Sequence, residues 1–256
     1  MNLTYQGSLP DPADANDRWA LFLDVDGTLI EFAATPDGVS VDPRVNEILL
    51  GLDRRFGHAV ALVSGRSIDQ LDDLFAPLRH TVAGLHGLER RGPDGQVIRA
   101  DCITTGLDRV RTSFTEFTNT HPEAIVEDKG MAVALHFRRA PGLADKADAL
   151  AQQLVADPIA NCDDSLVLQH GKMVVEFRPR GPHKGDVVEA FMAVAPFKGR
   201  VPVFIGDDIT DEDGFKTVNR MSGHSIRVGS GETSAATWRI DSVTELRDWL
   251  GGLVAP

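Results

Sequence analysis

The chain has 256 residues, of which 42% are hydrophobic, enough for one large domain or for a core domain with a smaller insert. Its formal net charge of −12 argues against nucleic acid and against an anionic membrane surface as partners. An anionic substrate would therefore need a locally cationic site.

The first twenty residues are polar and contain no apolar stretch that could serve as a signal peptide or a membrane span. The two cysteines, Cys102 and Cys162, lie far apart and outside any metal-ligand or redox spacing, which fits a reducing compartment. We therefore expect a cytoplasmic protein with no membrane partner. A monomer is favoured, although the sequence does not determine the oligomeric state.

The first part of the chain alternates apolar strands with amphipathic helices. The expected elements are a strand at Trp19–Val25, a helix beginning at Asp42, a strand at His58–Val63, a helix capped by Ser67, strands at Thr81–Gly84 and Leu85–Arg90, and a turn at 93–95. This order predicts a parallel sheet with helices on its faces.

The middle of the chain loses this rhythm and follows an αββαββ order. Its expected elements are a helix around Leu107–Phe117, strands at Ile125–Glu127 and Ala132–Phe137, a helix at Leu143–Val155, and a hairpin of Leu166–Gln169 with Met173–Phe177. We interpret residues 101–179 as an inserted α/β domain, and residues 1–100 with 180–256 as the core.

The last third returns to alternation, which completes an α/β, Rossmann-like parallel-sheet core. Its expected elements are a helix at Asp186–Val194, a strand at Val201–Ile205, a helix at Thr210–Val218, a strand at Ser225–Val228, and a final helix after a capping box of Ser242 and Glu245.

Four polar segments lie at strand ends or helix starts, where ligands bind in an open α/β sheet. They are Asp24–Thr28, Ser64–Arg66, Lys184–Gly185 and Gly206–Asp211. Each segment alone is more often a turn or a solvated surface. Because all four fall in order at the ends of alternating elements, they jointly favour Mg²⁺-assisted phosphoryl transfer.

Asp24 and Asp26 follow the first strand and are separated by one residue. Two unit charges ~4 Å apart interact by about 4 kcal/mol at an effective dielectric of ~20, so a cation must offset the pair. Asp24 is the candidate nucleophile, because a carboxylate can form an aspartyl-phosphate. Asp26 is the candidate general acid and base, a role typically worth ~10²–10⁴-fold in rate.

Mg²⁺ is the cation that this set of oxygen ligands favours. When it bridges Asp24, Asp207 and a phosphate oxygen, it removes the repulsion. The backbone carbonyl of Asp26 also suits it. Asp208 and Asp211 are candidates for supporting these ligands. The sequence leaves open how the metal contacts divide among the last three aspartates.

Four other residues are candidates for contact with the phosphate. Lys184 supplies a positive charge, while the Ser64 hydroxyl and the Gly65 N–H are neutral donors. Gly27 lets the backbone approach the phosphate closely.

Taken together, the segment Asp24–Leu29, Ser64, Lys184 and the segment Gly206–Asp211 resemble the four motifs of the haloacid dehalogenase (HAD) superfamily phosphatases, of which the first and fourth are the specific ones. A further set resembles the trehalose-phosphatase family, and the match runs from about Trp19 to Leu250. That set consists of Glu127 with Lys129, the run His136–Arg138, the run Val175–Pro179, and the run Gly206–Glu212. The resemblance implies a HAD-like core with a mobile α/β cap, Mg²⁺ dependence, and hydrolysis of the small-molecule sugar phosphate trehalose 6-phosphate.

The resemblance also implies that the cap binds the sugar. A disaccharide presents many hydroxyl groups, to which charged side chains make strong hydrogen bonds. The residues implied are Glu127, Lys129, Arg138 and Glu176. Arg66 is expected to reach the phosphate or the cap. The chain departs from the family at Val25 and Phe137, where members often carry Tyr, and at Ala132, where they often carry Ser.

Three alternatives remain open at this point. One is a phosphatase for another sugar phosphate, such as sucrose 6-phosphate. Another is a phosphomutase with a related cap, although a mutase needs several cations for its distal phosphate. The third is an inactive sugar-phosphate sensor, which the presence of both Asp24 and Asp26 disfavours, since binding alone does not require the acid.

Overall fold

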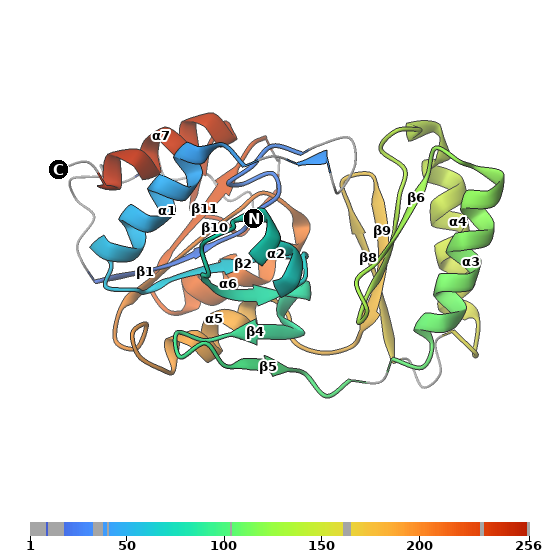
Figure 1. Cartoon of the computed structure of the whole chain (residues 1–256), viewed down its shortest axis with the longest axis horizontal. Helices are drawn as coiled ribbons and strands as arrows, with labels where there is room; N and C mark the ends of the chain where they lie inside the picture. The colour runs from blue at the N-terminus through green and yellow to red at the C-terminus, as the bar shows by residue number, and fades with distance from the viewer. Residues whose placement is uncertain are drawn as a thin grey trace. The chain divides into compact units, whose positions relative to one another are not determined.

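The computed structural model describes residues 9, 18–32, 38–39, 41–102, 104–160, 165–230 and 233–254. They fall into two compact units (Figure 1). Unit 1 is drawn from Met1–Phe32, Ser40–Arg99 and Pro182–Pro256, and unit 2 from Ala33–Val39 and Ala100–Gly181. The predicted limits of the insert, 101–179, fall inside the segment Ala100–Gly181 of unit 2. Unit 2 also includes residues from the segment Ala33–Val39, which we expected in the core.

Unit 1 is built on an eight-stranded sheet in the order β12-β11-β10-β1-β2-β3-β4-β5. Pairing is parallel from β12 to β3 and antiparallel from β3 to β5. The strands are β1 (Trp19–Leu23), β2 (Val60–Val63), β3 (Thr81–Gly84), β4 (Glu89–Arg91), β5 (Val97–Arg99), β10 (Val201–Gly206), β11 (His224–Val228) and β12 (Trp238–Ile240). Its central strands are apolar throughout, as expected for strands covered on both faces.

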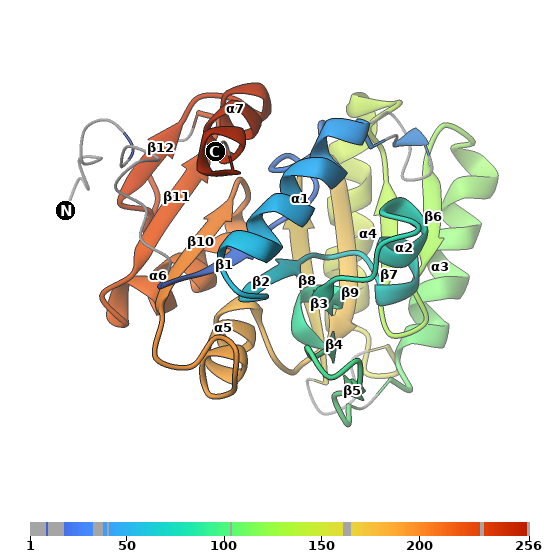
Figure 2. The same ribbon diagram turned by 60° about the vertical axis from the view of Figure 1, so that its left-hand side comes forward.

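Helices cover both faces of this sheet (Figure 2). α1 packs against α7 on one face, and α5 packs against α6 on the other. The helices of unit 1 are α1 (Pro43–Arg55), α2 (Ile68–Leu74), α5 (Lys184–Met192), α6 (Glu212–Arg220) and α7 (Val243–Val254). Asp42 caps α1, and Ser67 with Gln70 forms a capping box on α2, so both helices begin where the sequence predicts.

The position of β1 determines where a ligand can bind in unit 1. β1 pairs with β2 on one side and with β10 on the other. The chain leaves β1 toward β2 and β3, and later returns toward β10 and β11, so the strand order reverses at β1. A crevice opens outside the carboxyl ends of the strands at such a reversal.

Unit 2 has a four-stranded antiparallel sheet in the order β6-β7-β9-β8. Its elements are α3 (Leu107–Thr120), β6 (Ile125–Asp128), β7 (Val133–His136), α4 (Ala144–Ala156), β8 (Leu166–Gly171) and β9 (Val174–Pro179). Both helices pack on one face of the sheet, where Phe114 and Phe177 meet in the core. The opposite face carries polar side chains.

The predicted fold class is confirmed: a parallel-sheet α/β core is interrupted by a second α/β unit. One expected strand, Leu85–Arg90, is right only in its second half. Leu85–Gly87 forms a 3₁₀ turn, and strand β4 begins at Glu89. Leu85 and His86 there have positive φ angles of 50° and 58°, which no local pattern announces. The three-residue strands β5 and β12 were not predicted.

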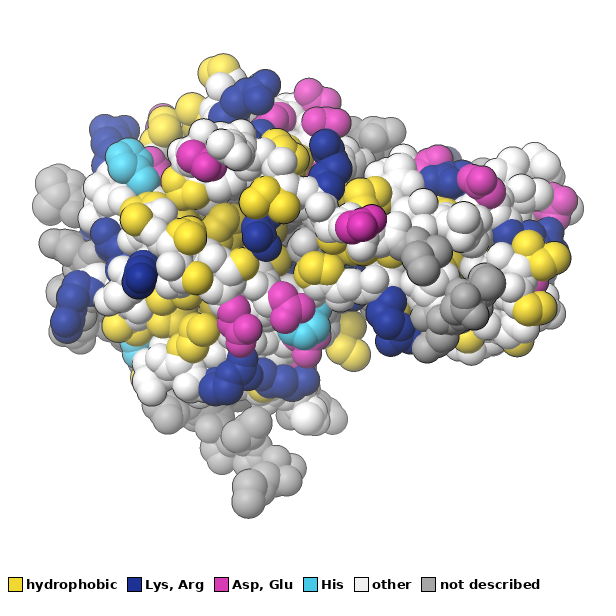
Figure 3. Space-filling model, turned by 90° about the horizontal axis from the view of Figure 1, so that it is seen from below, with side chains coloured by type: hydrophobic (Ala, Val, Ile, Leu, Met, Phe, Trp, Pro, Cys, Tyr) yellow, Lys and Arg dark blue, Asp and Glu magenta, His cyan; other side chains and the backbone are white. Residues whose placement is uncertain are grey.

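The surface is mixed in charge. On the face shown in Figure 3, basic, acidic and hydrophobic side chains are interspersed. None of the described helices combines the length and the hydropathy needed to cross a membrane. Cys102 is a free cysteine, and Cys162 lies outside the described residues.

An ion pair between Asp72 and Arg91 links helix α2 to the sheet. Arg91 on β4 donates from both terminal nitrogens to the two oxygens of Asp72 on α2, at 2.8 and 2.7 Å. The hydrogen bond from Arg91 lowers the pKa of Asp72. A carboxyl group whose pKa is lowered by folding stabilises the protein above its unfolded pKa, and that stabilisation disappears as the pH falls through the folded pKa.

We therefore predict that Asp72→Asn lowers the free energy of unfolding by about 1.5–3 kcal/mol at pH 7. Urea unfolding across pH measures it, and the difference from the parent should begin to shrink below the unfolded pKa of 3.8 and vanish once the pH has fallen below the lower, folded pKa. The neighbouring exposed Asp73 is the control, and Asp73→Asn should stay within about 0.5 kcal/mol. An Asp72 effect that persists at the acid end would contradict this account.

Candidate active site

Three polar residues lie together at the carboxyl edge of the sheet. Asp24, Ser64 and Asp207 directly follow β1, β2 and β10. Because Leu23 pairs with both Leu62 and Ile205, the three strands end at the same level. All three side chains are buried.

Lys184, the first residue of α5, links two carboxylates. Its ammonium donates to Asp24 Oδ1 at 2.8 Å and to Asp211 Oδ1 at 2.6 Å. Thr28 Oγ1 donates to the other oxygen of Asp24, Oδ2, at 3.1 Å. The Lys184 side chain is 2% exposed, so this charge is removed from water. Asp24 is thus held at both oxygens by groups from its own loop and from a distant helix.

Burial governs the protonation of this cluster. Burial raises the pKa of Asp24 well above its usual value, and the nearby Asp211 and Asp207 raise it further, while Lys184 opposes them. Burial alone would lower the pKa of Lys184, but Asp211 and Asp24 hold it above its usual range. The lysine therefore stays cationic, and additional positive charge at the cluster would favour the ionised form of Asp24.

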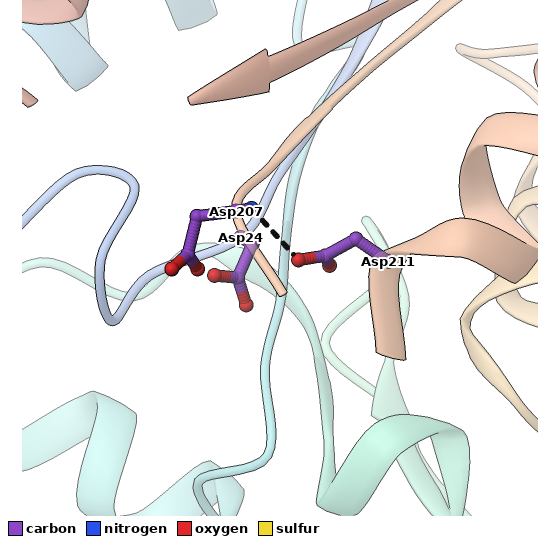
Figure 4. Close-up of side chains that lie close together, drawn as sticks. All are labelled: Asp24, Asp207 and Asp211. Carbon is purple, nitrogen blue, oxygen red and sulfur yellow. Dashed lines mark hydrogen bonds between the residues drawn. The ribbon is translucent and has the colours of Figure 1, made fainter. Parts of the chain in front are cut away.

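Asp211 shapes the loop after β10. Its Oδ2 accepts the backbone N–H of Asp207 at 2.9 Å (Figure 4) and that of Asp208, also at 2.9 Å. A side chain on Gly206 would lie 2.2 Å from Asp211 Cγ, so only glycine fits there. Asp208 accepts the N–H of Ile209 at 2.8 Å and caps the short turn that follows.

The carboxylates form a cluster that suits a hard divalent cation. Asp24, Asp207 and Asp211 each offer one oxygen, and these oxygens lie within 4.8 Å of one another. In Figure 4 the carboxylates of Asp24 and Asp207 lie beside each other, with Asp211 reaching in from the other side. Carboxylate oxygens are ligands that Mg²⁺ prefers. The donor set therefore fits the expected ion.

Gly27 lies directly against this cluster. Its φ angle is +81°, and a Cβ atom there would come within 2.4 Å of Asp207 Oδ2. Glycine is required for both reasons, because an L side chain would be strained and would collide with the carboxylate. The turn after β1 thus brings backbone close to Asp207.

Asp26 is held by Arg66. The Arg66 Nε and Nη2 atoms donate to the two oxygens of Asp26, each at 2.7 Å, and the Arg66 backbone N–H donates to Ser64 Oγ at 3.1 Å. Such a two-bond pair fixes the orientation of the carboxylate. Arg66, expected at the phosphate or the cap, therefore contacts the candidate acid.

Gly65 sits under the ring of His86. A Cβ atom on Gly65 would lie 2.6 Å from His86 Nε2, so the ring covers the Ser64–Arg66 turn closely. The left-handed backbone at Leu85 and His86 places the ring there. A conformation of this kind costs ~1–3 kcal/mol per residue and is often found near functional sites.

In unit 2, three of the four predicted sugar-binding residues form one cluster on the polar face of the sheet. Lys129 Nζ donates to Glu176 Oε2 at 2.6 Å and lies 3.9 Å from Glu127 Oε2. The fourth residue, Arg138, donates to the carbonyl oxygen of Lys172 at 2.9 Å.

Sequence reasoning missed two members of these clusters. Thr28 contacts Asp24, and its position four residues after Asp24 in a tight turn was the available signal. His136 lies 2.7 Å from Glu127 through Nε2, although sequence reasoning placed it only in the run His136–Arg138 and gave it no role at a site. The signal for His136 was strand alternation, which places it on the face opposite Leu135.

The chain resembles known phosphatases over most of its length. The trehalose-phosphatase family model matches residues 22–244. A probable trehalose-phosphate phosphatase of Sinorhizobium fredii is 45% identical, covering 93% of this chain and 88% of that protein. The trehalose-6-phosphate phosphatase of Escherichia coli K12 is 42% identical, covering 94% and 89%.

Solved structures show the same fold. The C-terminal domain of Candida albicans trehalose-6-phosphate phosphatase superposes with a TM-score of 0.83 at 20% identity, covering 93% of this chain and 92% of that domain. Phosphatases of the HAD superfamily match as well, which confirms the HAD-like fold class. The fold and these relatives define a phosphoric monoester hydrolase. The chain belongs to the trehalose-phosphatase family.

The buried charge cluster makes a prediction for stability. Lys184→Met leaves two buried carboxylates without their shared cation, which should lower the free energy of unfolding by about 3–5 kcal/mol at pH 7 in metal-free buffer. The loss should shrink on acidification, because a protonated Asp24 needs no counter-charge.

Urea unfolding measures this, with Lys216→Met as the control. Lys216 is 62% exposed, so its replacement should change stability by no more than about 0.5 kcal/mol. Equal effects of the two substitutions would show that the buried ion pairs contribute nothing special.

Proposed function

We propose that this protein hydrolyses trehalose 6-phosphate to trehalose and phosphate, as a Mg²⁺-dependent enzyme of trehalose biosynthesis that works through an aspartyl-phosphate. The observation that carries the proposal is the environment of Asp24, which is held by Lys184 and Thr28 next to Asp207. The 42% identity to the E. coli enzyme supports the choice of substrate.

Asp24 acts as the nucleophile. One of its carboxylate oxygens attacks phosphorus, the bond between phosphorus and the sugar oxygen breaks, and the phosphoryl group is left on Asp24. Lys184 and Thr28 fix the orientation of the carboxylate before the attack, so little reorganisation remains. Lys184 also stabilises the negative charge that the phosphoryl oxygens carry.

Asp26 transfers the proton in both half-reactions. It donates a proton to the sugar oxygen as that oxygen leaves, because an alkoxide is a poor leaving group. It then takes a proton from the water that attacks phosphorus and releases phosphate. The two hydrogen bonds from Arg66 hold its carboxylate in one orientation.

Mg²⁺ would be held by Asp24, Asp207 and the backbone carbonyl of Asp26. When bound, it supplies positive charge that offsets the repulsion between the carboxylates and the phosphate. Asp211 is the less suitable ligand, because its oxygens accept three hydrogen bonds, from Lys184 and from two backbone N–H groups, whereas those of Asp24 accept two, from Lys184 and Thr28. Asp208 caps a turn. Both therefore support the loop that carries Asp207.

The phosphate would be bound by donors from three loops. These are the ammonium of Lys184, the hydroxyl of Ser64, the N–H of Gly65 and the backbone around Gly27. Ser64 and Gly65 lie at the carboxyl end of β2, beside Asp24 at the end of β1. Of these donors Lys184 carries a positive charge, and a bound Mg²⁺ would add the further positive charge that a phosphate needs beside this acidic cluster.

The polar face of unit 2 would recognise the sugar through Glu127, Lys129 and Glu176, with Arg138 as a further contact. The two carboxylates and one ammonium at its centre carry no excess of positive charge. A phosphomutase needs cations there for a second phosphate, so this composition favours a neutral sugar.

The test is phosphate release with Mg²⁺ across trehalose 6-phosphate, sucrose 6-phosphate and glucose 6-phosphate. Asp24→Asn provides the zero-activity control. We expect trehalose 6-phosphate to have the highest kcat/KM, by at least about tenfold, because the unpaired polar groups left by a poorer sugar each cost about 1–3 kcal/mol. Comparable turnover of glucose 6-phosphate would sink the substrate assignment, and a preference for sucrose 6-phosphate would support the alternative.

A Mg²⁺ titration tests whether Asp207, rather than Asp208, is a metal ligand. Asp207→Asn should raise the Mg²⁺ concentration for half-maximal activity by more than about tenfold, because it removes a ligand. Asp208→Asn should change that concentration little. If Asp208→Asn had the larger effect, the roles of these two residues would be reversed.

A further inference from the structure

We propose that His136 is a positioning residue for sugar recognition, which acts by fixing the carboxylate of Glu127. The inference rests on the proposed function, and it gives a role to a residue whose strand is otherwise apolar. His136 Nε2 lies 2.7 Å from Glu127 Oε2.

The strand register places both residues on the polar face of unit 2. Ile125 on β6 pairs with His136 on β7, and Glu127 pairs with Ala134. Side chains two residues apart on a strand share a face, so Glu127 and His136 are diagonal neighbours across the two strands. The alternate residues Val133 and Leu135 enter the core beneath α3 and α4.

Glu127 depends on His136 more than on Lys129. Lys129 Nζ lies 2.6 Å from Glu176 and 3.9 Å from Glu127, so this ammonium is committed to Glu176. The imidazole therefore lies closer to Glu127 than the ammonium of Lys129 does. An ionised carboxylate can only accept, so the imidazole donates this hydrogen bond through Nε2–H.

The contact falls on one oxygen of the carboxylate. Both His136 and Lys129 approach Oε2, so the pair fixes where Oε1 points. An imidazole ring has two side-chain torsions and is anchored on the adjacent strand, whereas a lysine arm loses far more rotamer freedom when it is held. The ring thus gives Glu127 a single orientation before any sugar hydroxyl donates to it.

Ala134 lies in the sheet between the charged residues of the sugar-recognition cluster. It lies between Glu127 and Glu176 in the register of β6, β7 and β9. An alanine there presents only a methyl group between the two strands that carry the charged groups. The class of ligand that suits such a face is a neutral polyhydroxyl, and His136 fixes one edge of it.

The test compares His136→Leu and His136→Gln in the full-length protein. For trehalose 6-phosphate, His136→Leu should raise KM by about tenfold, with a smaller change in kcat, because Glu127 loses its donor. His136→Gln retains an N–H donor and should restore KM to within about threefold of the parent. For p-nitrophenyl phosphate, which has no sugar, both variants should match the parent.

His170→Leu is the matched control, because His170 pairs with Asp148 in the same unit but is 52% exposed. It should leave KM for the sugar phosphate unchanged. If His170→Leu raises KM as much as His136→Leu does, or if His136→Gln fails to rescue, His136 acts only on the structure of unit 2 and the inference is wrong.

A double-mutant cycle tests whether His136 affects KM through Glu127. If His136 works through Glu127, then adding His136→Leu to Glu127→Gln should raise KM no further. Fully additive effects would overturn the inference. Turnover of trehalose 6-phosphate by the parent protein tests the proposed function separately, and if another sugar phosphate proves to be the substrate, the same cycle is measured with that compound.

Discussion

The structure of unit 1 depends on one buried cation. Lys184 donates to both Asp24 and Asp211, which come from loops that are far apart in sequence, and offsets part of their charge. Two buried carboxylates this close to each other and to Asp207 would be unstable without it. Asp211 then uses its second oxygen to hold the loop of Asp207 and Asp208. The hydrogen bonds of Lys184 and Asp211 therefore fix the positions of the candidate nucleophile, Asp24, and of the candidate metal ligand, Asp207.

The two units carry polar clusters of different chemistry. Unit 1 presents donors and carboxylates suited to a phosphate with a divalent cation, at the point where its strand order reverses. Unit 2 presents Glu127, Lys129 and Glu176 on an antiparallel sheet, a set suited to hydroxyl groups. The family match spans residues 22–244 and so includes both units.

Local sequence patterns predicted where the loops of the candidate active site lie. The partners of their side chains depend on contacts between residues far apart in sequence. Apolar runs that end at Asp24 and Ser64 revealed two carboxyl ends of strands, and Ser67 announced its helix. Lys184 pairs with Asp211, 27 positions away, and Arg66 pairs with Asp26, 40 positions away. No local sequence pattern predicts pairs at such separations. The apolar run at Leu85 concealed a left-handed turn for the same reason, since only the packing of His86 over Gly65 requires it.

The most direct test of the central claim is to trap the phosphoryl group on Asp24. Asp26→Asn should slow the attack by water while an aryl phosphate, whose leaving group needs no acid, still phosphorylates the enzyme. Acid quenching followed by peptide mass spectrometry should then find phosphate on the peptide that contains Asp24. Phosphate release in a first-turnover burst with no modified Asp24, or phosphate attached to another residue, would contradict the account.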